Sequence, residues 1–264
     1  MSKGTKSFNR SALVIAHPGH ELRVYGWVVE ARPQIHVLTD GSGSTGISRI
    51  PSTRSLAENI QATCGEIFPA GTDRELYQAM LKGNAPFFIA LAERLAHSFA
   101  VRGTDFVGAD AADGFNPAHD LCRAVVDLAI ALAERSTGKP IANYQFRLTD
   151  TKGGLAAAHD GDCVHCSLDD EVFTDKLRAA EGYSGLSEEV SRALDRVGRD
   201  YFRHEYLCPV KERFRFDGTE APYYEEVGQA RIGTGDYASV IRRDTHIDPI
   251  IAALRDRSLK PARV

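Results

Sequence analysis

Three histidines in this 264-residue chain occur in two short segments whose residue types suit metal chemistry. His17 and His20 lie three residues apart in Ala16-His17-Pro18-Gly19-His20-Glu21, and His119 lies in Asn116-Pro117-Ala118-His119-Asp120. Three imidazole nitrogens with one position left for water are the ligand set of a catalytic zinc ion. We therefore expect His17, His20 and His119 to bind Zn²⁺, or another divalent transition metal. The alternative is that each histidine only packs or caps a helix.

The first 150 residues contain the elements that must position these histidines. Apolar runs predict strands at 11–16, 35–39, 105–109 and 141–148, and a weak strand at 66–68. The helical spacing of apolar residues predicts helices at 20–31, 52–63 and 84–101, the second of them capped by Ser52. A further helix is expected to begin at Asn116-Pro117. Strands that alternate with helices indicate an α/β protein with a mostly parallel sheet and helices on both faces. Ligands bind such a sheet beyond the carboxyl ends of its strands, where both histidine segments stand.

The pattern changes after residue 150. Residues 171–207 look helical, 208–243 look irregular and aromatic, and a last helix is expected at about 247–257. We interpret 1–264 as a single domain in which 151–264 is a C-terminal elaboration that covers the active face. Its aromatic residues can stack on sugar rings or simply pack, and they are Phe214, Phe216, Tyr223, Tyr224 and Tyr237.

The amino-acid composition limits the classes of binding partner that we expect. Lys and Arg number 32 against 36 Asp and Glu, which argues against nucleic acid or an anionic membrane as the main partner. No apolar run approaches the ~20 residues that cross a bilayer, and the N-terminus lacks the apolar core of a signal peptide. Five scattered cysteines, with one Cys163-Val-His-Cys166 motif, predict a reduced, cytoplasmic protein rather than a disulfide framework. Nothing in the composition indicates an oligomeric state.

The two histidine segments resemble the motifs of the LmbE-like (PIG-L) zinc-dependent de-N-acetylases. That family has A-H-P-D-D-E after its first strand, where this chain has Ala16 to Glu21 in the form AHPGHE, and a second box, H-P-D-H, that corresponds to residues 116–119 here. The resemblance extends loosely over 10–206. It implies a Rossmann-like fold, metal ligation by His17 and His119, and amide hydrolysis of N-acetylated amino sugars.

Two departures from the family motif affect catalysis. The family's second aspartate, a metal ligand, is His20 here, and imidazole suits zinc as well as carboxylate does. The first aspartate, the family's general base, is Gly19, which cannot carry a proton. Asp113, on the loop before Asn116, is our first candidate for that missing role, and Asp110, at the end of its strand, is the second. Each has the alternative of an ordinary loop carboxylate that bonds backbone amides.

Three further residues are candidates for the site. Asp40, which opens the glycine-rich loop 40–46, and Arg54, in the next helix, are expected to bind substrate, although Arg54 can equally pair with Glu58. His246, before the last helix, is expected to serve as an acid or oxyanion donor, or else to flank that helix at the surface. The glycine-rich loop lacks the spacing and the lysine of a phosphate-binding loop, so we interpret it as a rim loop.

These residues predict a zinc-dependent hydrolase that removes an N-acyl group from an amino sugar or a related small molecule. Gly19 supports an alternative, a degenerate deacetylase scaffold that binds metal and a glycan or metabolite without efficient amide hydrolysis. A third hypothesis is hydrolysis of an ester or of another amide, because a better leaving group needs less help from the acid that is missing here.

Overall fold

A computed structural model describes residues 10–43, 45–149, 162–215, 221–235 and 238–260. The strands are β1 (Ser11–Ile15), β2 (Gln34–Val37), β3 (Thr63–Cys64), β4 (Phe106–Asp110), β5 (Ala142–Phe146), β6 (Val164–Ser167) and β7 (His204–Pro209). They form one sheet in the order β3-β2-β1-β4-β5-β7-β6. The strands from β3 to β5 are parallel, and β7 and β6 extend the sheet antiparallel. The predicted α/β fold with a mostly parallel, Rossmann-like sheet is confirmed.

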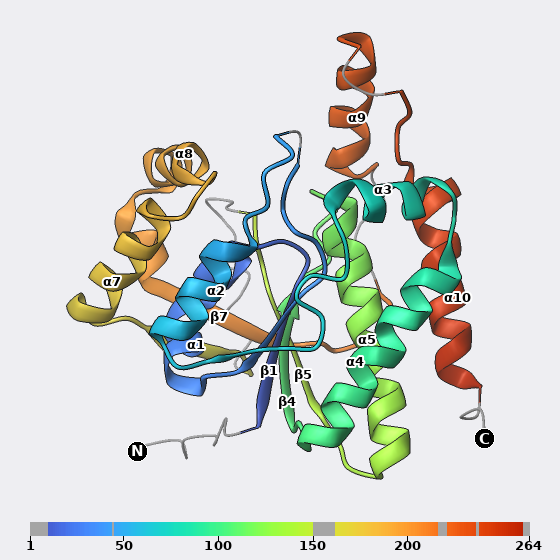
Figure 1. Ribbon diagram of the computed structural model, residues 1–264, viewed down its shortest axis with the longest axis horizontal. Helices are drawn as coiled ribbons and strands as arrows, with labels where there is room; N and C mark the ends of the chain where they lie inside the picture. Colours follow the sequence, from blue (N-terminus) through green and yellow to red (C-terminus); the bar gives the residue numbers. More distant parts are fainter. Residues whose placement is uncertain (1–9, 44, 150–161, 216–220, 236–237, 261–264) are drawn as a thin grey trace.

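Helices cover both faces of this sheet (Figure 1). One face packs against α3 (Asp73–Leu81), α4 (Ala85–Arg102), α5 (Pro117–Thr137) and α10 (Asp248–Leu259), and the other against α1 (Tyr25–Ala31) and α2 (Ile50–Asn59). Successive residues of β1 enter opposite cores, Val14 on the α5 side and Leu13 on the α1 side, because side chains alternate along a strand. Burial on both faces explains why β1 and β4 are almost wholly apolar.

The longest helix, α5, begins where the sequence predicts. The Asn116 side chain accepts a hydrogen bond from the Ala118 backbone N–H, and Pro117 occupies the first turn, where its missing N–H is not needed. Helix α2 begins two residues before the predicted Ser52 cap, with Pro51 in its first turn. The prediction of a strand at 66–68 is wrong, because β3 lies at Thr63–Cys64 instead. In the 66–68 segment, the Ile67 carbonyl accepts a hydrogen bond from the Val37 backbone N–H of β2.

The helical prediction for 171–207 is only partly correct. Helices α7 (Asp170–Glu181) and α8 (Ser187–Val197) are interrupted at Gly182 and Gly185, and a 3-10 turn, η2 (Arg199–Arg203), leads into strand β7. In β7, Glu205 and Leu207 are buried and alternate with more exposed residues, which is strand periodicity. Residues 208–243, predicted irregular, contain helix α9 (Tyr223–Gly233), whose few buried side chains leave little periodic signal.

The expectation that all cysteines are reduced is wrong for one pair. Cys163 and Cys208 form a disulfide, with their Cα atoms 4.2 Å apart. The pairing of Val164 with Leu207 in the antiparallel strands brings the two cysteines opposite each other. Cys64, Cys122 and Cys166 are free thiols, so the disulfide does not join the two cysteines of the Cys163-Val-His-Cys166 motif.

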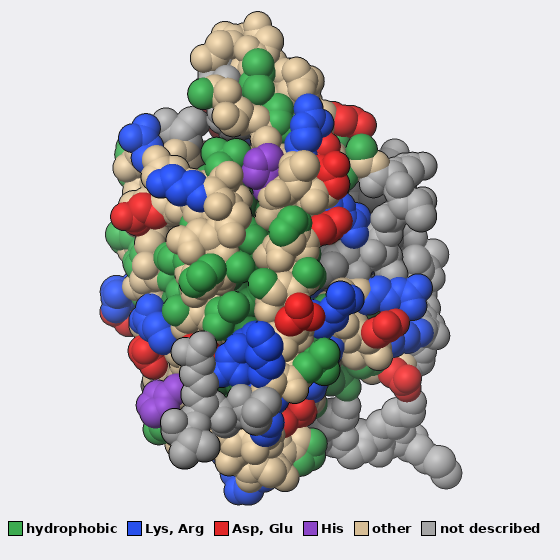
Figure 2. Space-filling view, turned by 90° about the vertical axis from the view of Figure 1, so that its right-hand side faces the viewer, with side chains coloured by type: hydrophobic (Ala, Val, Ile, Leu, Met, Phe, Trp, Pro, Cys, Tyr) green, Lys and Arg blue, Asp and Glu red, His purple; other side chains and the backbone are tan. Residues whose placement is uncertain are grey.

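The outer surface over α4 and α10 carries side chains of both charges. Figure 2 shows Lys and Arg interspersed with Asp and Glu around hydrophobic side chains on this face. Among the described residues, no helix is both long and apolar enough to cross a membrane.

Candidate metal centre

The three histidines meet at the carboxyl ends of two neighbouring strands. His17 and His20 follow β1, with His20 opening the 3-10 turn η1 (His20–Val24), and His119 lies in the first turn of α5, after β4. The chain runs outward from β1 through β2 and β3, then returns to β4 on the other side, so this is the point where strand order reverses. One ligand nitrogen from each histidine lies within 4.8 Å of the others. The predicted convergence is therefore present.

The rings enclose a space of the size that one metal ion needs. Ring centroids are 5.3 Å apart for His17–His20, 5.7 Å for His17–His119 and 4.9 Å for His20–His119. Two imidazoles on a tetrahedral zinc at about 2.1 Å have nitrogens about 3.4 Å apart, so small ring movements complete the set. The His20 side chain is 17% exposed, against 7% and 6% for His17 and His119, so His20 is the most solvent-exposed of the three.

Two aspartates orient two of the rings. Asp110 Oδ2 lies 2.8 Å from His20 Nδ1 and also accepts the Ala16 backbone N–H at 2.7 Å. Asp113 Oδ1 lies 3.2 Å from His119 Nδ1. A carboxylate on Nδ1 keeps the proton there and leaves Nε2 as the electron-pair donor, which is the usual second layer around histidine-bound metals. The two acids predicted for proton transfer thus contact His20 and His119 directly.

Electrostatics around the cluster favour a bound cation. Burial lowers the pKa of His17 well below its usual value, and the neighbouring His20 and His119 lower it further, so this imidazole is neutral. Burial also opposes charge on His119, but the hydrogen bond and negative charge of Asp113 raise its pKa overall. Among the described residues, neither Asp110 Oδ1 nor Asp73 Oδ1, beside His17, has a hydrogen-bond partner, although both oxygens are buried. Buried carboxylates in this number need positive charge nearby, which a divalent ion supplies.

A side chain at position 19 would meet both an unfavourable backbone conformation and a close neighbour. Gly19 has φ +106°, and a Cβ built there would lie 2.3 Å from Leu186 Cδ1, so Leu186 would have to move. Leu186 belongs to the segment between α7 and α8, so an apolar side chain from the C-terminal half borders this position. The positive φ therefore favours glycine here, and the contact with Leu186 adds to that preference.

Glu21 fixes the loop that carries His17 and His20. One carboxylate oxygen accepts the Gly19 backbone N–H at 2.7 Å, and the other accepts the Tyr183 hydroxyl at 2.9 Å. The Tyr183 hydroxyl also lies 2.5 Å from Thr53 Oγ1 in α2. Burial raises the pKa of Glu21 despite these hydrogen bonds. This buried network ties the histidine loop to α2 and to the segment after α7.

The other predicted site residues lie in different surroundings. Asp40 Oδ1 accepts hydrogen bonds from both the backbone and the hydroxyl of Ser42, and from the Asp73 backbone N–H, so it organises the glycine-rich loop. Arg54 is exposed and lies over the Phe68 ring, 5.1 Å from its centroid. His246 accepts the Arg242 backbone N–H at 3.0 Å, a partner from its own segment.

Two charged residues that sequence reasoning missed act on the cluster. Asp73, the first residue of α3, places Oδ1 3.7 Å from His17 Nε2. Arg49, just before α2, has a buried Nε with no hydrogen-bond partner among the described residues, and its charge contributes to the low pKa of His17. A sequence signal existed for Asp73: Thr72 and Glu75 form a capping box, which marks the start of a helix.

An aromatic pair extends outward from the cluster. Phe115 stacks on the His119 ring, with centroids 6.4 Å apart, and Tyr223 of α9 stacks on Phe115 at 5.1 Å. Both aromatic side chains are about half exposed, at 48% and 51%. Tyr224 is buried instead and Phe214 packs against the core, whereas Phe216 and Tyr237 lie outside the described residues.

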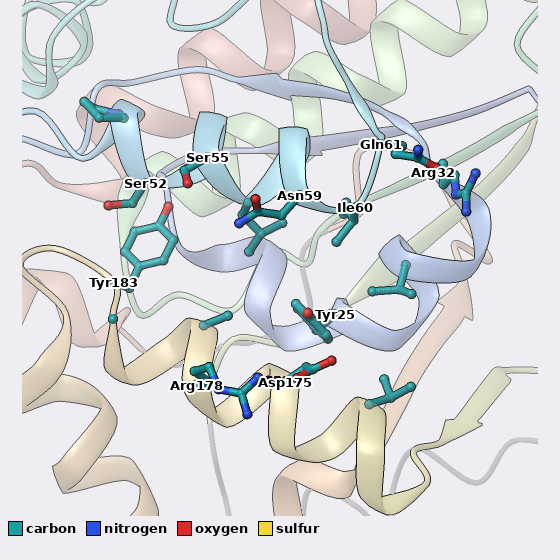
Figure 3. Close-up of a pocket in the computed structure, with 16 residues that line it drawn as sticks. Tyr25, Arg32, Ser52, Ser55, Asn59, Ile60, Gln61, Asp175, Arg178 and Tyr183 are labelled. Carbon is teal, nitrogen blue, oxygen red and sulfur yellow. Dashed lines mark hydrogen bonds and ion pairs between the residues drawn. The ribbon is translucent and has the colours of Figure 1, made fainter.

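A cavity of about 800 Å³ lies apart from the histidines, between α1, α2 and α7 (Figure 3). Tyr183 and Ser52 stand at one end of it, and Arg32 and Gln61 at the other. None of the three histidines lines this cavity. Tyr183, which lines this cavity, donates a hydrogen bond from its hydroxyl to Glu21 on the histidine loop.

Comparison with known proteins gives one structural similarity. No family model matches the chain, and no curated protein matches it either. Among solved structures, the antimicrobial reagent A40926 pseudoaglycone deacetylase Dbv21 is similar over 79% of this chain and 99% of its own. The two sequences are 16% identical, and the TM-score is 0.46.

Proposed function

We propose that this protein is a zinc-dependent hydrolase that removes an N-acyl group, such as acetyl, from an amino sugar or a related small molecule. The observation that carries the proposal is the convergence of His17, His20 and His119 at the strand-order reversal. A zinc ion bound there polarises an acyl carbonyl and lowers the pKa of water. The histidines suit zinc because two of them are held in the donor tautomer by buried aspartates.

The residues around the cluster support individual roles. Asp110 and Asp113 orient His20 and His119, and the buried carboxylates offset the charge of the ion. Arg49 adds a positive charge near His17. We assign the substrate class from the resemblance of the two histidine segments to the de-N-acetylase motifs.

Metal analysis and an activity assay test the proposal together. Purified protein is expected to contain about one zinc per chain and to release acetate from N-acetylglucosamine or one of its conjugates. His17→Ala and His119→Ala are expected to lose both the metal and the activity. His97→Ala, a histidine within α4, is the matched control. A wild-type chain that binds no metal, or a His17→Ala variant that behaves like wild type, refutes the proposal.

One observation favours a second candidate function. Leu186 borders the position where the family's base would stand, which fits a scaffold that binds metal and a glycan without efficient hydrolysis. The two functions differ in turnover: the scaffold binds N-acetylglucosamine conjugates in calorimetry but releases no acetate. An ester analogue in the same assay separates general hydrolysis from amide hydrolysis, because an ester needs less help from an acid.

A further inference from the structure

Amide hydrolysis requires a group that moves a proton from water to the departing amine, and Gly19 cannot provide it. The described residues place four aspartates around the histidines: Asp73, Asp110, Asp113 and Asp120. Three of them are engaged elsewhere. Asp110 is completely buried behind His20 and binds the Ala16 N–H. Asp113 Oδ1 accepts the Phe115 N–H as well as contacting His119, and Asp120 Oδ1 accepts two backbone N–H groups of the same loop.

Asp73 and Asp110 each have a buried Oδ1 that has no hydrogen-bond partner among the described residues. Asp110 is completely buried and its Oδ2 contacts His20 and the Ala16 N–H, whereas the Asp73 side chain is 10% exposed and its Oδ2 accepts the Gly43 backbone N–H at 2.6 Å, which fixes the carboxylate. Asp73 Oδ1 lies 3.7 Å from His17 Nε2, beyond hydrogen-bond distance. Asp73 is not in the set of ligand atoms that lie within 4.8 Å of one another. Its free oxygen therefore stands at the edge of the metal space rather than among the ligands.

The surroundings of Asp73 hold this carboxylate rigidly. It begins helix α3, whose N-terminus favours a negative charge, and Thr72 caps the helix through the Glu75 N–H. Asp40 accepts the Asp73 backbone N–H, so the glycine-rich loop and the helix support each other. A group that is fixed through one oxygen and open at the other can receive a proton without reorganising.

We propose that Asp73 is the proton carrier of this site, in place of the acid that position 19 lacks. Its Oδ1 accepts a proton from the attacking water as the water oxygen bonds to the acyl carbon. The same proton passes to the amine nitrogen as the carbon–nitrogen bond breaks, so amide and water become carboxylic acid and amine, and Asp73 is regenerated. This inference rests on the proposed hydrolase function.

The position of the carboxylate can be tested without any activity. Azide is titrated into cobalt(II)-loaded wild type, Asp73→Asn and Glu75→Gln, and binding is followed by the visible spectrum of the metal. Removing a negative charge beside the open position is expected to tighten azide binding at least about tenfold in Asp73→Asn. Glu75→Gln removes an exposed charge from the same helical turn and is expected to match wild type. Equal azide affinity in all three proteins overturns the proposal.

Turnover on N-acetylglucosamine conjugates tests the role itself. Asp73→Asn keeps an acceptor for the Gly43 N–H, so it is expected to fold and to retain its zinc while kcat falls roughly 10²–10⁴-fold. Formate is expected to restore part of the activity of Asp73→Ala. An active wild type with an equally active Asp73→Asn overturns the role of Asp73 but leaves the hydrolase standing. A zinc-loaded wild type that is inert on every acyl amino sugar overturns both.

Discussion

Replacing Gly19 by alanine tests the steric account of the histidine loop. The backbone at Gly19 has φ +106°, a region that costs an L-residue about 1–2 kcal/mol. The new Cβ would lie 2.3 Å from Leu186 Cδ1, and overpacking of this kind typically costs about 1–3 kcal/mol. We therefore expect Gly19→Ala to lower the free energy of unfolding by about 2–5 kcal/mol.

A double-mutant cycle separates the two contributions. In a Leu186→Ala background the steric contact is gone, so Gly19→Ala is expected to cost only the backbone strain, about 1–2 kcal/mol. The coupling between the two positions is then about 1–3 kcal/mol, measured by urea unfolding of all four proteins. If Gly19→Ala is as stable as wild type, or if the cycle shows no coupling energy, the steric conflict between position 19 and Leu186 is refuted. The same geometry predicts that Gly19→Asp, which introduces the first aspartate of the de-N-acetylase motif, does not increase hydrolysis.

Further predictions concern buried groups away from the cluster. Glu205→Gln is expected to lower the urea-measured free energy of unfolding by about 3–5 kcal/mol, because the buried Lys176 keeps the Phe202 carbonyl as an acceptor but loses its counter-charge; a loss below about 1 kcal/mol contradicts this. Tyr183→Phe is expected to cost about 1–3 kcal/mol in thermal unfolding by removing the hydroxyl that Glu21 accepts, and an unchanged melting temperature argues against that network. Burial lowers the pKa of His36 to about 3, so the folded protein keeps this imidazole neutral while the unfolded chain binds a proton below about pH 6.5. The free energy of unfolding therefore falls by about 1.4 kcal/mol per pH unit as the pH drops from 6.5 toward 3. The free energy of unfolding, measured with urea, is expected to differ between pH 7.5 and pH 5 by about 2 kcal/mol less in His36→Leu than in wild type. The same difference in both proteins would refute the low pKa assigned to His36.

The parts of the fold that the sequence predicted are those with strong local signals. Strands β1 and β4 are buried on both faces and read as continuous apolar runs. Helix α5 carries a cap at Asn116, a proline in its first turn and a long apolar stripe. Because these three elements carry or flank the histidines, the convergence of His17 with His119 followed from chain topology alone.

The remaining features depend on contacts between distant segments. Leu186 borders Gly19 although the two residues are 167 positions apart, and Asp73 reaches His17 from a different helix, so neither contact has a local signal. Strands β6 and β7 are short and partly exposed, so the alternation of apolar and polar residues that marks a strand is weak in both. The Cys163–Cys208 disulfide follows from the pairing of those two strands, which spacing along the chain could not indicate.

X-ray absorption of the zinc-loaded protein reports the atoms bound to the ion, and so shows whether the three histidines hold it. Three imidazole nitrogens are expected at about 2.0–2.1 Å, with one nitrogen fewer or no bound zinc in each of the single variants His17→Ala, His20→Ala and His119→Ala. Sulfur ligands, or a nitrogen count that none of these variants changes, would show that the ion binds elsewhere and contradict the account.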